Sequence, residues 1–482
     1  MVFQTLIKLT LGLSFLFAIN TEPDTDVRIE AASLTPGSEI PACTVVVPIE
    51  VTEIDGAKDF TYVQPGDVLC LVPGVRSNMK IQNLHGTPEK PIIIRNEGGN
   101  VIITGEDLLT GGIGIKSSSY VRISGAGVVS QCGAEYEPEE QNCGIEIVDT
   151  HKGVKINTPD GVLNDIELDH IFIHETSTLT ETRGITIHPL ERQLISGIYV
   201  HHNYVTNTLA EGIYIGAEPR GKPYEELGKI SDVDISYNRV ENTGYDGIKV
   251  KVAIENVNVH HNVVLNNGLS RTPAHQGGIK LAMSVGNYYN NLSINNFEGI
   301  RMGRELENSN SRYFNNVVVN SESVGIGSTE SHAEIFNNTV VYSSATGIDA
   351  TGTDSKVFDN IIVETMGTPI NSPRGYVGKN FIGSIYQVGF INPINGDYRL
   401  LPDSPAIDAG EEQGPFVSID YEDKPRVQGV RQDLGAYEYV DSEAEFPEIF
   451  ANPTDLNLFQ RTGSMLQWHM GESDPYPNDG RR

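Results

Sequence analysis

The chain repeats the stretch ISGIYVHHNYVTN (195–207) as ISDVDISYNRVEN (230–242) and again as IENVNVHHNVVLNN (254–267). Each copy consists of a short alternating strand, an Asn, a second apolar strand and another Asn. Shorter copies follow as YYNNLSINN (288–296), RYFNNVVVN (312–320), AEIFNNTVV (333–341) and KVFDNIIVE (356–364). Short alternating β-branched segments separated by polar turns do not form useful helices, so only extended structure is expected here.

The repeat length identifies the fold class. One Asn recurs at the same place in every copy: Asn203, Asn238, Asn262, Asn291, Asn316, Asn338 and Asn360. A second Asn follows four residues behind in the first five copies: Asn207, Asn242, Asn266, Asn295 and Asn320. A period in the low twenties fits one coil of a parallel β-helix, whose coils pair at about 4.8 Å. We predict an all-β, single-stranded right-handed parallel β-helix with Asn ladders in its turns and a Val, Ile and Leu core.

The early coils carry a resemblance to a known family. The segment PGDVLCLVPGV…GTPEKPIIIRNEGGNVIITG (65–105) resembles the opening of secreted bacterial right-handed β-helix proteins, including the chondroitinase B and alginate lyase family. The resemblance implies a polysaccharide lyase. In that family acidic calcium ligands precede a catalytic Lys by a few residues, and an Arg follows on the next coil. Asp246 and Lys251 resemble that acid–Lys spacing and Arg271 is a candidate for the Arg, although the family's Asn-x-Glu-x-x-x-x-Lys stretch is absent.

The chain is expected to fall into five parts. The segments DYRLLPDSPAIDAG (397–410) and DYEDKPRVQGVRQDLGAYEY (420–439) resemble a C-terminal module found after many bacterial secreted β-helices, and we expect it to cover the last coil. Its acids could bind a cation, but capping turns are the favoured use: Asp408, Asp420, Asp433 and Glu438. The expected parts are a signal peptide (1–20), a lead-in (21–44), the β-helix (45–390), the capping module (391–440) and an acidic tail (441–482).

Charge and targeting signals limit the partners. The 482 residues include 34 Lys and Arg against 64 Asp and Glu, a formal net charge of −30. Such a surface repels nucleic acid and anionic membranes, so an acidic substrate requires a locally basic site. The apolar run 9–18 is too short to span a bilayer and predicts an export signal. No later apolar segment is long enough to span a bilayer either. We expect a secreted, periplasmic or cell-surface monomer without an organic cofactor.

Four cysteines all lie in the first third of the chain: Cys43, Cys70, Cys132 and Cys143. In an exported protein they predict two disulfides with three connectivities, among which a local Cys132–Cys143 pair is favoured. A zinc site is the alternative, although no CxxC or nearby His pair accompanies these cysteines.

A turn ending in Gly-Ile aligns the outer surface of successive coils. We expect a positive φ to require the Gly at this corner. Because the Ile faces inward, the next residue faces outward. This outward column reads Thr186, Tyr214, Lys249, Lys280, Arg301, Gly327 and Asp349. A basic strip of Lys249, Lys251, Lys280, Arg301 and Arg304 therefore runs beside the carboxylates Glu211, Asp246 and Glu298. Such a strip costs stability unless an anion binds or the neighbouring acids neutralise it.

Loop insertions surround the same coils. The extra segments are ETSTLTET (175–182), AEPRGKPYEELG (217–228) and GLSRTPAHQ (268–276). Long loops on a solenoid are where binding residues usually lie, so we expect these to wall a substrate site.

The residues in this site suit β-elimination on a uronic-acid polysaccharide. Cations or a metal would stabilise the enolate charge and a base would remove the proton. The predicted catalytic residues are Lys249, Lys251, Lys280, Arg301, Arg271 and His275. The predicted substrate-binding residues are Tyr214, His188, Arg183, Tyr245, Arg220 and Arg304. Ca²⁺ on Glu211, Asp246 and Glu298 is the one cofactor considered.

Two alternatives stay open on the same scaffold. A glycoside hydrolase would use Glu211, Asp246 and Glu298, whose coil spacing suits a retaining or an inverting pair. A non-catalytic polysaccharide-binding or adhesin solenoid would use the same face without cleaving the sugar, because fold alone does not decide function.

Overall fold

The structure of the protein is a computed structural model. It describes residues 42–105, 111–127, 130–157, 163–176, 182–218, 221–303, 306, 309–411 and 417–440. The predicted signal peptide, most of the lead-in and the acidic tail lie outside these residues. No helix among the described residues is long and apolar enough to cross a membrane.

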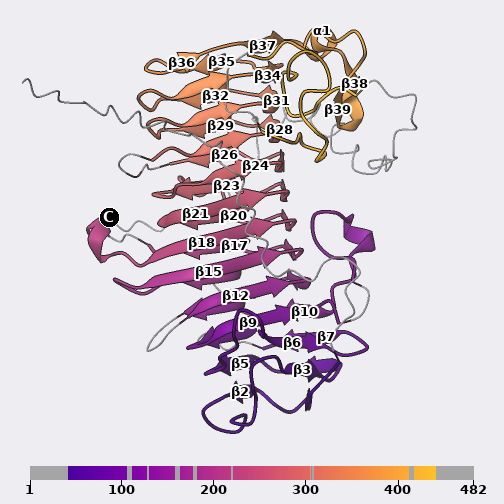
Figure 1. Cartoon of the computed structure of the whole chain (residues 1–482), viewed down its shortest axis with the longest axis vertical. Helices are drawn as coiled ribbons and strands as arrows, with labels where there is room; N and C mark the ends of the chain where they lie inside the picture. The colour runs from indigo at the N-terminus through magenta and orange to yellow at the C-terminus, as the bar shows by residue number, and fades with distance from the viewer. Residues whose placement is uncertain are drawn as a thin grey trace, which may run out of the picture. The chain divides into compact units, whose positions relative to one another are not determined.

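Three long parallel sheets form the body of the protein, and each coil passes through sheet A, then sheet C, then sheet B (Figure 1). Sheet A contains β1 (Val45–Val47), β3 (Val68–Leu71), β6 (Ile92–Asn96), β9 (Ser119–Ser124), β12 (Asn164–Asp169), β15 (Leu194–His201), β18 (Lys229–Ser236), β21 (Ala253–His260), β24 (Asn287–Tyr289), β27 (Arg312–Phe314), β30 (Glu334–Phe336), β33 (Lys356–Phe358) and β36 (Tyr376–Val377).

Sheet C contains β4 (Gly74–Arg76), β7 (Val101–Thr104), β10 (Ile145–Val148), β13 (Ile171–His174), β16 (Tyr204–Thr206), β19 (Arg239–Glu241), β22 (Val263–Leu265), β25 (Leu292–Ile294), β28 (Val317–Ser321), β31 (Thr339–Ser343), β34 (Asn360–Val363) and β37 (Asn380–Gly383). Sheet B contains β2 (Glu53–Asp55), β5 (Met79–Gln82), β8 (Ile113–Lys116), β11 (Lys152–Asn157), β14 (Arg183–His188), β17 (Ile213–Gly216), β20 (Ile248–Lys251), β23 (Gly277–Ala282), β26 (Glu298–Met302), β29 (Val324–Ser328), β32 (Thr346–Ala350) and β35 (Thr368–Asn371). The predicted right-handed parallel β-helix is therefore confirmed.

Short helices and one antiparallel pair lie outside the three sheets. They are η1 (Pro138–Glu140), η2 (Tyr224–Glu226), α1 (Ile385–Val388), η3 (Pro393–Asn395) and the pair β38 (Phe390–Asn392) and β39 (Asp397–Leu400).

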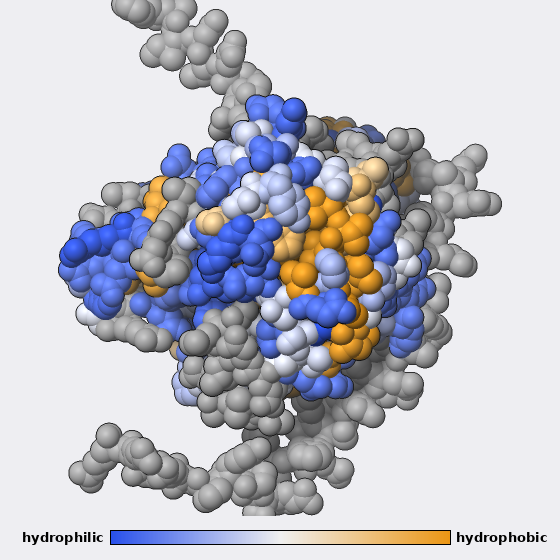
Figure 2. Space-filling model, turned by 90° about the horizontal axis from the view of Figure 1, so that it is seen from below, coloured by the Kyte–Doolittle hydropathy of each residue, from blue (hydrophilic) through white to orange (hydrophobic). Residues whose placement is uncertain are grey.

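The core consists of stacked aliphatic rows. The Ile of every Gly-Ile turn is fully buried and pairs with its equivalent on the next coil, as in the row Ile213, Ile248, Ile279, Ile300, Ile326 and Ile348. At the N-terminal end of the stack, the first coils expose Val46 and Val75, which are 63% and 62% accessible. Figure 2 views the protein from this N-terminal end and shows hydrophobic residues gathered there.

The Gly at the Gly-Ile corner has a different cause from the one expected. None of these corner glycines has a positive φ. A Cβ on Gly212 would instead lie 2.3 Å from a methyl of Val240 and 2.9 Å from the carbonyl oxygen of Gly247. The next coil and the sheet C strand approach too closely for any side chain, so glycine is required here by space.

The Asn ladder is confirmed and continues to Asn380. Nδ2 of Asn262 donates to Oδ1 of Asn291 at 3.0 Å and to the carbonyl oxygens of Ile235 and His260. Its Oδ1 accepts from the backbone and side chain of Asn238. Each amide therefore joins its own turn to the coils before and after it, as the buried turn backbone requires.

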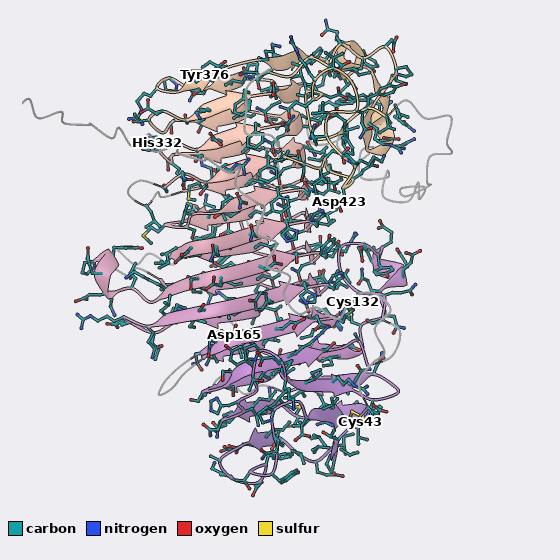
Figure 3. All side chains as sticks on the ribbon, in the orientation of Figure 1. Cys43, Cys132, Asp165, His332, Tyr376 and Asp423 are labelled. Carbon is teal, nitrogen blue, oxygen red and sulfur yellow. A yellow bond between two sulfur atoms is a disulfide. The ribbon has the colours of Figure 1, made fainter. Side chains whose placement is uncertain are left out.

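Two disulfides join the cysteines as Cys43–Cys70 and Cys132–Cys143, which confirms the local pair and excludes the zinc alternative. The second disulfide closes the acidic loop that contacts the turns of later coils, where Glu137 of the loop lies 3.6 Å from Arg239. Figure 3 shows Cys132 on the same side of the stack as Asp423 of the C-terminal segment.

The C-terminal segment lies along the side of the β-helix. Its apolar residues pack on the outer face of sheet C, where they contact Val317, Val341 and Ile361. The strands of the last coil stay largely exposed, with Tyr376 at 53% and Ile382 at 53%. Glu411 of the segment also accepts from the hydroxyl of Tyr376 and from the backbone N–H of Lys379. The expected cover of the last coil stays a prediction.

The acids of this segment hold turns together. Asp420 accepts backbone N–H bonds from Glu422, Lys424 and Glu438. Asp433 accepts two more, from Asp408 and Tyr439. The carboxylate oxygens of Asp420 and Asp433 accept bonds from backbone N–H groups, which agrees with the expectation that these acids cap turns.

Candidate functional site

The outward column of sheet B has the predicted register. Strand pairing places Tyr214 beside Lys249, Lys249 beside Lys280, and Lys280 beside Arg301. The strands that carry them, β17, β20, β23 and β26, follow one another along the stack (Figure 1). The three cations therefore occupy neighbouring positions on one sheet.

Lys249 lies beneath the surface in contact with three acceptors. Its Nζ is 2.5 Å from Oδ2 of Asp246, 2.8 Å from Nδ1 of His275 and 3.3 Å from Oε1 of Glu211. Its side chain is 3% exposed. Asp246 accepts a hydrogen bond from the ammonium, His275 lies within hydrogen-bond distance of it, and Glu211 forms an ion pair with it, so Lys249 is enclosed by partners.

Glu211 is fully buried and shared between cations. Its Oε2 accepts from Nε of Arg183 at 2.6 Å. Burial opposes its ionisation, but the nearby His275 and the charges of Arg183 and Lys249 outweigh it and hold the pKa of Glu211 well below its usual range. Glu211 is therefore a permanent anion.

Lys251 differs from the other cations of the site. It follows Lys249 by two residues on β20, is partly buried, and has its Nζ 5.5 Å from the ring centroid of Tyr214. Among the described residues no carboxylate lies within 4.0 Å of its Nζ. Burial and then the charge of Lys249 lower the pKa of Lys251. Lys251 can therefore reach its neutral, basic form more easily than a free lysine.

The next two coils carry ion pairs. Nζ of Lys280 lies 2.6 Å from Oε2 of Glu298. Arg301 donates from Nη1 to Asp349 at 2.8 Å, and its Nε is 3.7 Å from Glu298. On these two coils, neighbouring acids neutralise the cations of the predicted basic strip. This is one of the two ways in which such a strip was expected to be stabilised.

The remaining predicted site residues contact different partners. Arg271 is bound to both carboxylate oxygens of Glu322 at 2.6 Å. The ring of Tyr245 is 4.9 Å from that of His275. Nδ1 of His188 is 3.0 Å from the carbonyl oxygen of Gly216.

Tyr214 is only 1% exposed and has Arg183 5.0 Å from its ring, so it supports cations and does not present a face to a sugar. Its role in substrate binding stays a prediction. Arg220 and Arg304 lie outside the described residues, as does part of the first two insertions.

The predicted calcium ligands do not form one cluster. Glu298 is bound to Lys280, while the donor atoms of Glu211 and Asp246 lie within 4.8 Å of one another and of His275. Ca²⁺ takes six to eight oxygen ligands. Here one donor is a nitrogen, and Lys249 is bonded to the group. These residues do not fit Ca²⁺ in this arrangement.

Comparison with known proteins finds similar solved structures but no similar sequence family. No family model and no curated protein matches the chain. The pectate lyase Pel9A is similar with 12% identity over 85% of this chain and 99% of that one, at a TM-score of 0.46. A GH136 lacto-N-biosidase from Eubacterium ramulus has 17% identity over 71% and 68%, at 0.44. An alginate lyase from Paenibacillus sp. has 15% identity over 71% and 100%, at 0.37.

The sequence did not point to several residues that complete the site. Glu218 lies 3.6 Å from Nη2 of Arg183, and Glu322 binds Arg271 across 51 residues. The backbone N–H of Gly277 donates to Oδ1 of Asp246 at 2.7 Å. Glu218 could have been found from its place in an insertion, but no sequence pattern marks the other two.

Proposed function

We propose that the protein is a polysaccharide lyase that cleaves a uronic-acid polysaccharide by β-elimination, with Lys251 as the proton acceptor. One observation carries the proposal. Of the five described cations Arg183, Lys249, Lys251, Lys280 and Arg301, only Lys251 has no carboxylate within 4.0 Å. Its lowered pKa suits a base, because proton transfer is most efficient when the pKa of the base approaches the working pH.

The reaction can be assigned to residues of this chain. Nζ of neutral Lys251 takes the proton from the carbon next to the uronate carboxylate, and that electron pair forms the new C=C bond. The bond from the adjacent carbon to the glycosidic oxygen breaks. We assign the acceptor role to Nδ1 of His275, which lies 2.8 Å from Nζ of Lys249, so that the ring proton is on Nε2 and passes from there to the leaving oxygen. We assign Nη2 of Arg301 to the uronate carboxylate, since Nη1 is used by Asp349.

The burial of the carboxylates disfavours a hydrolase at this site. Glu211 and Asp246 are both 0% exposed, and cations or backbone bind their oxygens. A glycosidase needs two carboxyl groups that reach the scissile bond, one of them protonated. These two side chains do not reach the surface.

We also propose that the protein works outside the cytoplasm on an extracellular polysaccharide. Two disulfides are typical of oxidising compartments.

The test is a panel of alginate, pectate and glycosaminoglycans, followed by ultraviolet absorbance of the unsaturated ends. We expect absorbance with at least one polymer and a loss of about 100-fold or more in kcat for Lys251→Met. The control is Lys356→Met, an exposed lysine of sheet A paired with Glu334, which should keep full activity. Reducing ends without absorbance, or binding without cleavage, would overturn the proposal.

A further inference from the structure

Three metal-type donors converge on the ammonium of Lys249. Oε1 of Glu211, Oδ2 of Asp246 and Nδ1 of His275 lie 3.3, 2.5 and 2.8 Å from its Nζ. The donor atoms of these three residues lie within 4.8 Å of one another. Two carboxylates and one imidazole form a donor set that suits Zn²⁺ and similar ions.

The donors are held in place by contacts other than Lys249. Arg183 binds the second oxygen of Glu211, and the N–H of Gly277 binds the second oxygen of Asp246. The ring of His275 packs on that of Tyr245, and the backbone N–H of His275 donates to the carbonyl oxygen of Thr272 at 3.0 Å. Removal of the lysine amine should therefore leave the three donors converging on the same point.

Glu211 supplies a second and independent observation. Its Oε1 is buried on a residue with 0% exposure and has no hydrogen-bond partner of good geometry. This oxygen faces the ammonium at 3.3 Å in an ion pair that does not have the geometry of a hydrogen bond. A buried carboxylate oxygen without a hydrogen bond is unfavourable, and a cation bound to it would stabilise it.

We propose that Lys249 substitutes for a divalent metal ion: it occupies a three-ligand site made of Glu211, Asp246 and His275, so that the protein works without a metal there and binds one when the lysine is shortened. Lys249 is then a positioning residue that neutralises two buried carboxylates and orients His275. The activity part of this inference rests on the proposed lyase function, while the metal-binding part does not.

The experiment is a titration of chelator-treated protein with Zn²⁺, followed by calorimetry and thermal unfolding. The wild type should bind no Zn²⁺ at this site. Lys249→Ala should bind one Zn²⁺ per chain and gain thermal stability from it, because binding to the native state shifts unfolding by mass action. Addition of His275→Ala to this variant should weaken binding by about tenfold or more. Lys280→Ala is the matched control, since Lys280 contacts a single carboxylate and its removal creates no cluster.

Two results would overturn the inference. One is a folded Lys249→Ala protein, judged by circular dichroism, that binds no Zn²⁺. The other is a wild type whose activity disappears with a chelator and returns with Ca²⁺, which does not require any variant to fold. If no polysaccharide is cleaved at all, the lyase proposal fails while the Zn²⁺ titration still decides the role of Lys249.

Discussion

Nδ1 of His201 lies 2.9 Å from Nδ1 of His202, so one ring must donate a proton that the other accepts. Nε2 of His201 bonds to Glu167 and Nε2 of His202 faces Glu135. The bond to Glu167 requires a proton on Nε2 of His201, and the two Nδ1 atoms share one more proton between the rings. The Nδ1 atoms of His260 and His261 are likewise close, at 2.7 Å.

This pair predicts a loss of stability in mild acid. Burial, followed by the charge of His201, lowers the pKa of His202 to about 3. The unfolded chain therefore binds the proton first, and stability falls by about 1 kcal/mol between pH 6 and pH 5. The pKa of His201 is raised because its bond to Glu167 outweighs burial, but that effect is lost mainly above the ordinary pKa of histidine. Calorimetry of His202→Phe should show a flatter decline in Tm, unlike exposed His332→Phe. Equal declines would contradict this explanation.

The pH dependence of the proposed lyase follows from Lys251. Because its pKa is lowered, kcat/KM should rise with pH and level off below the ordinary lysine pKa. The charge of Glu218 raises this pKa, so Glu218→Gln should move the inflection to lower pH. Glu226→Gln, in the same insertion but paired with Arg192, should leave the profile unchanged. A shift to higher pH in Glu218→Gln would exclude Lys251 as the base.

The Arg183–Glu211 pair should contribute strongly to stability. Arg183→Met leaves a fully buried carboxylate with one cation fewer, which should cost about 3 kcal/mol or more in the free energy of unfolding. Arg192→Met breaks an exposed pair with Glu226 and should cost at most about 0.5 kcal/mol. Urea titration distinguishes the two, and similar midpoints would show that Glu211 finds another partner.

The Asn ladder should be sensitive to a single deletion. Asn262→Ala removes a side chain that bonds to two neighbouring coils, and leaves buried carbonyl and N–H groups unpaired. We expect a cost of about 3 kcal/mol in the free energy of unfolding, measured by denaturant. Asn395→Ala, at an exposed position of η3, should change it by less than about 0.5 kcal/mol.

Much of the site's backbone could be predicted from sequence, and little of its chemistry. The column from Tyr214 to Arg301 has the predicted register, because the Gly-Ile turn marks the start of each sheet B strand and side chains alternate along it. The same reasoning treated Lys249 as an exposed catalytic cation. It could not show that Asp246 and Glu211 would surround the amine, since the length of a lysine side chain allows several positions.

The sequence by itself determined the coil, its Asn ladder and the row of inward Ile residues, because these repeat with the period of the structure and each copy restates the pattern. Only the tertiary structure decided which acid neutralises which base, why Gly212 must be glycine, and where the C-terminal segment packs. Those features depend on contacts between residues far apart in the chain, such as Arg271 and Glu322. A local sequence pattern cannot predict such contacts.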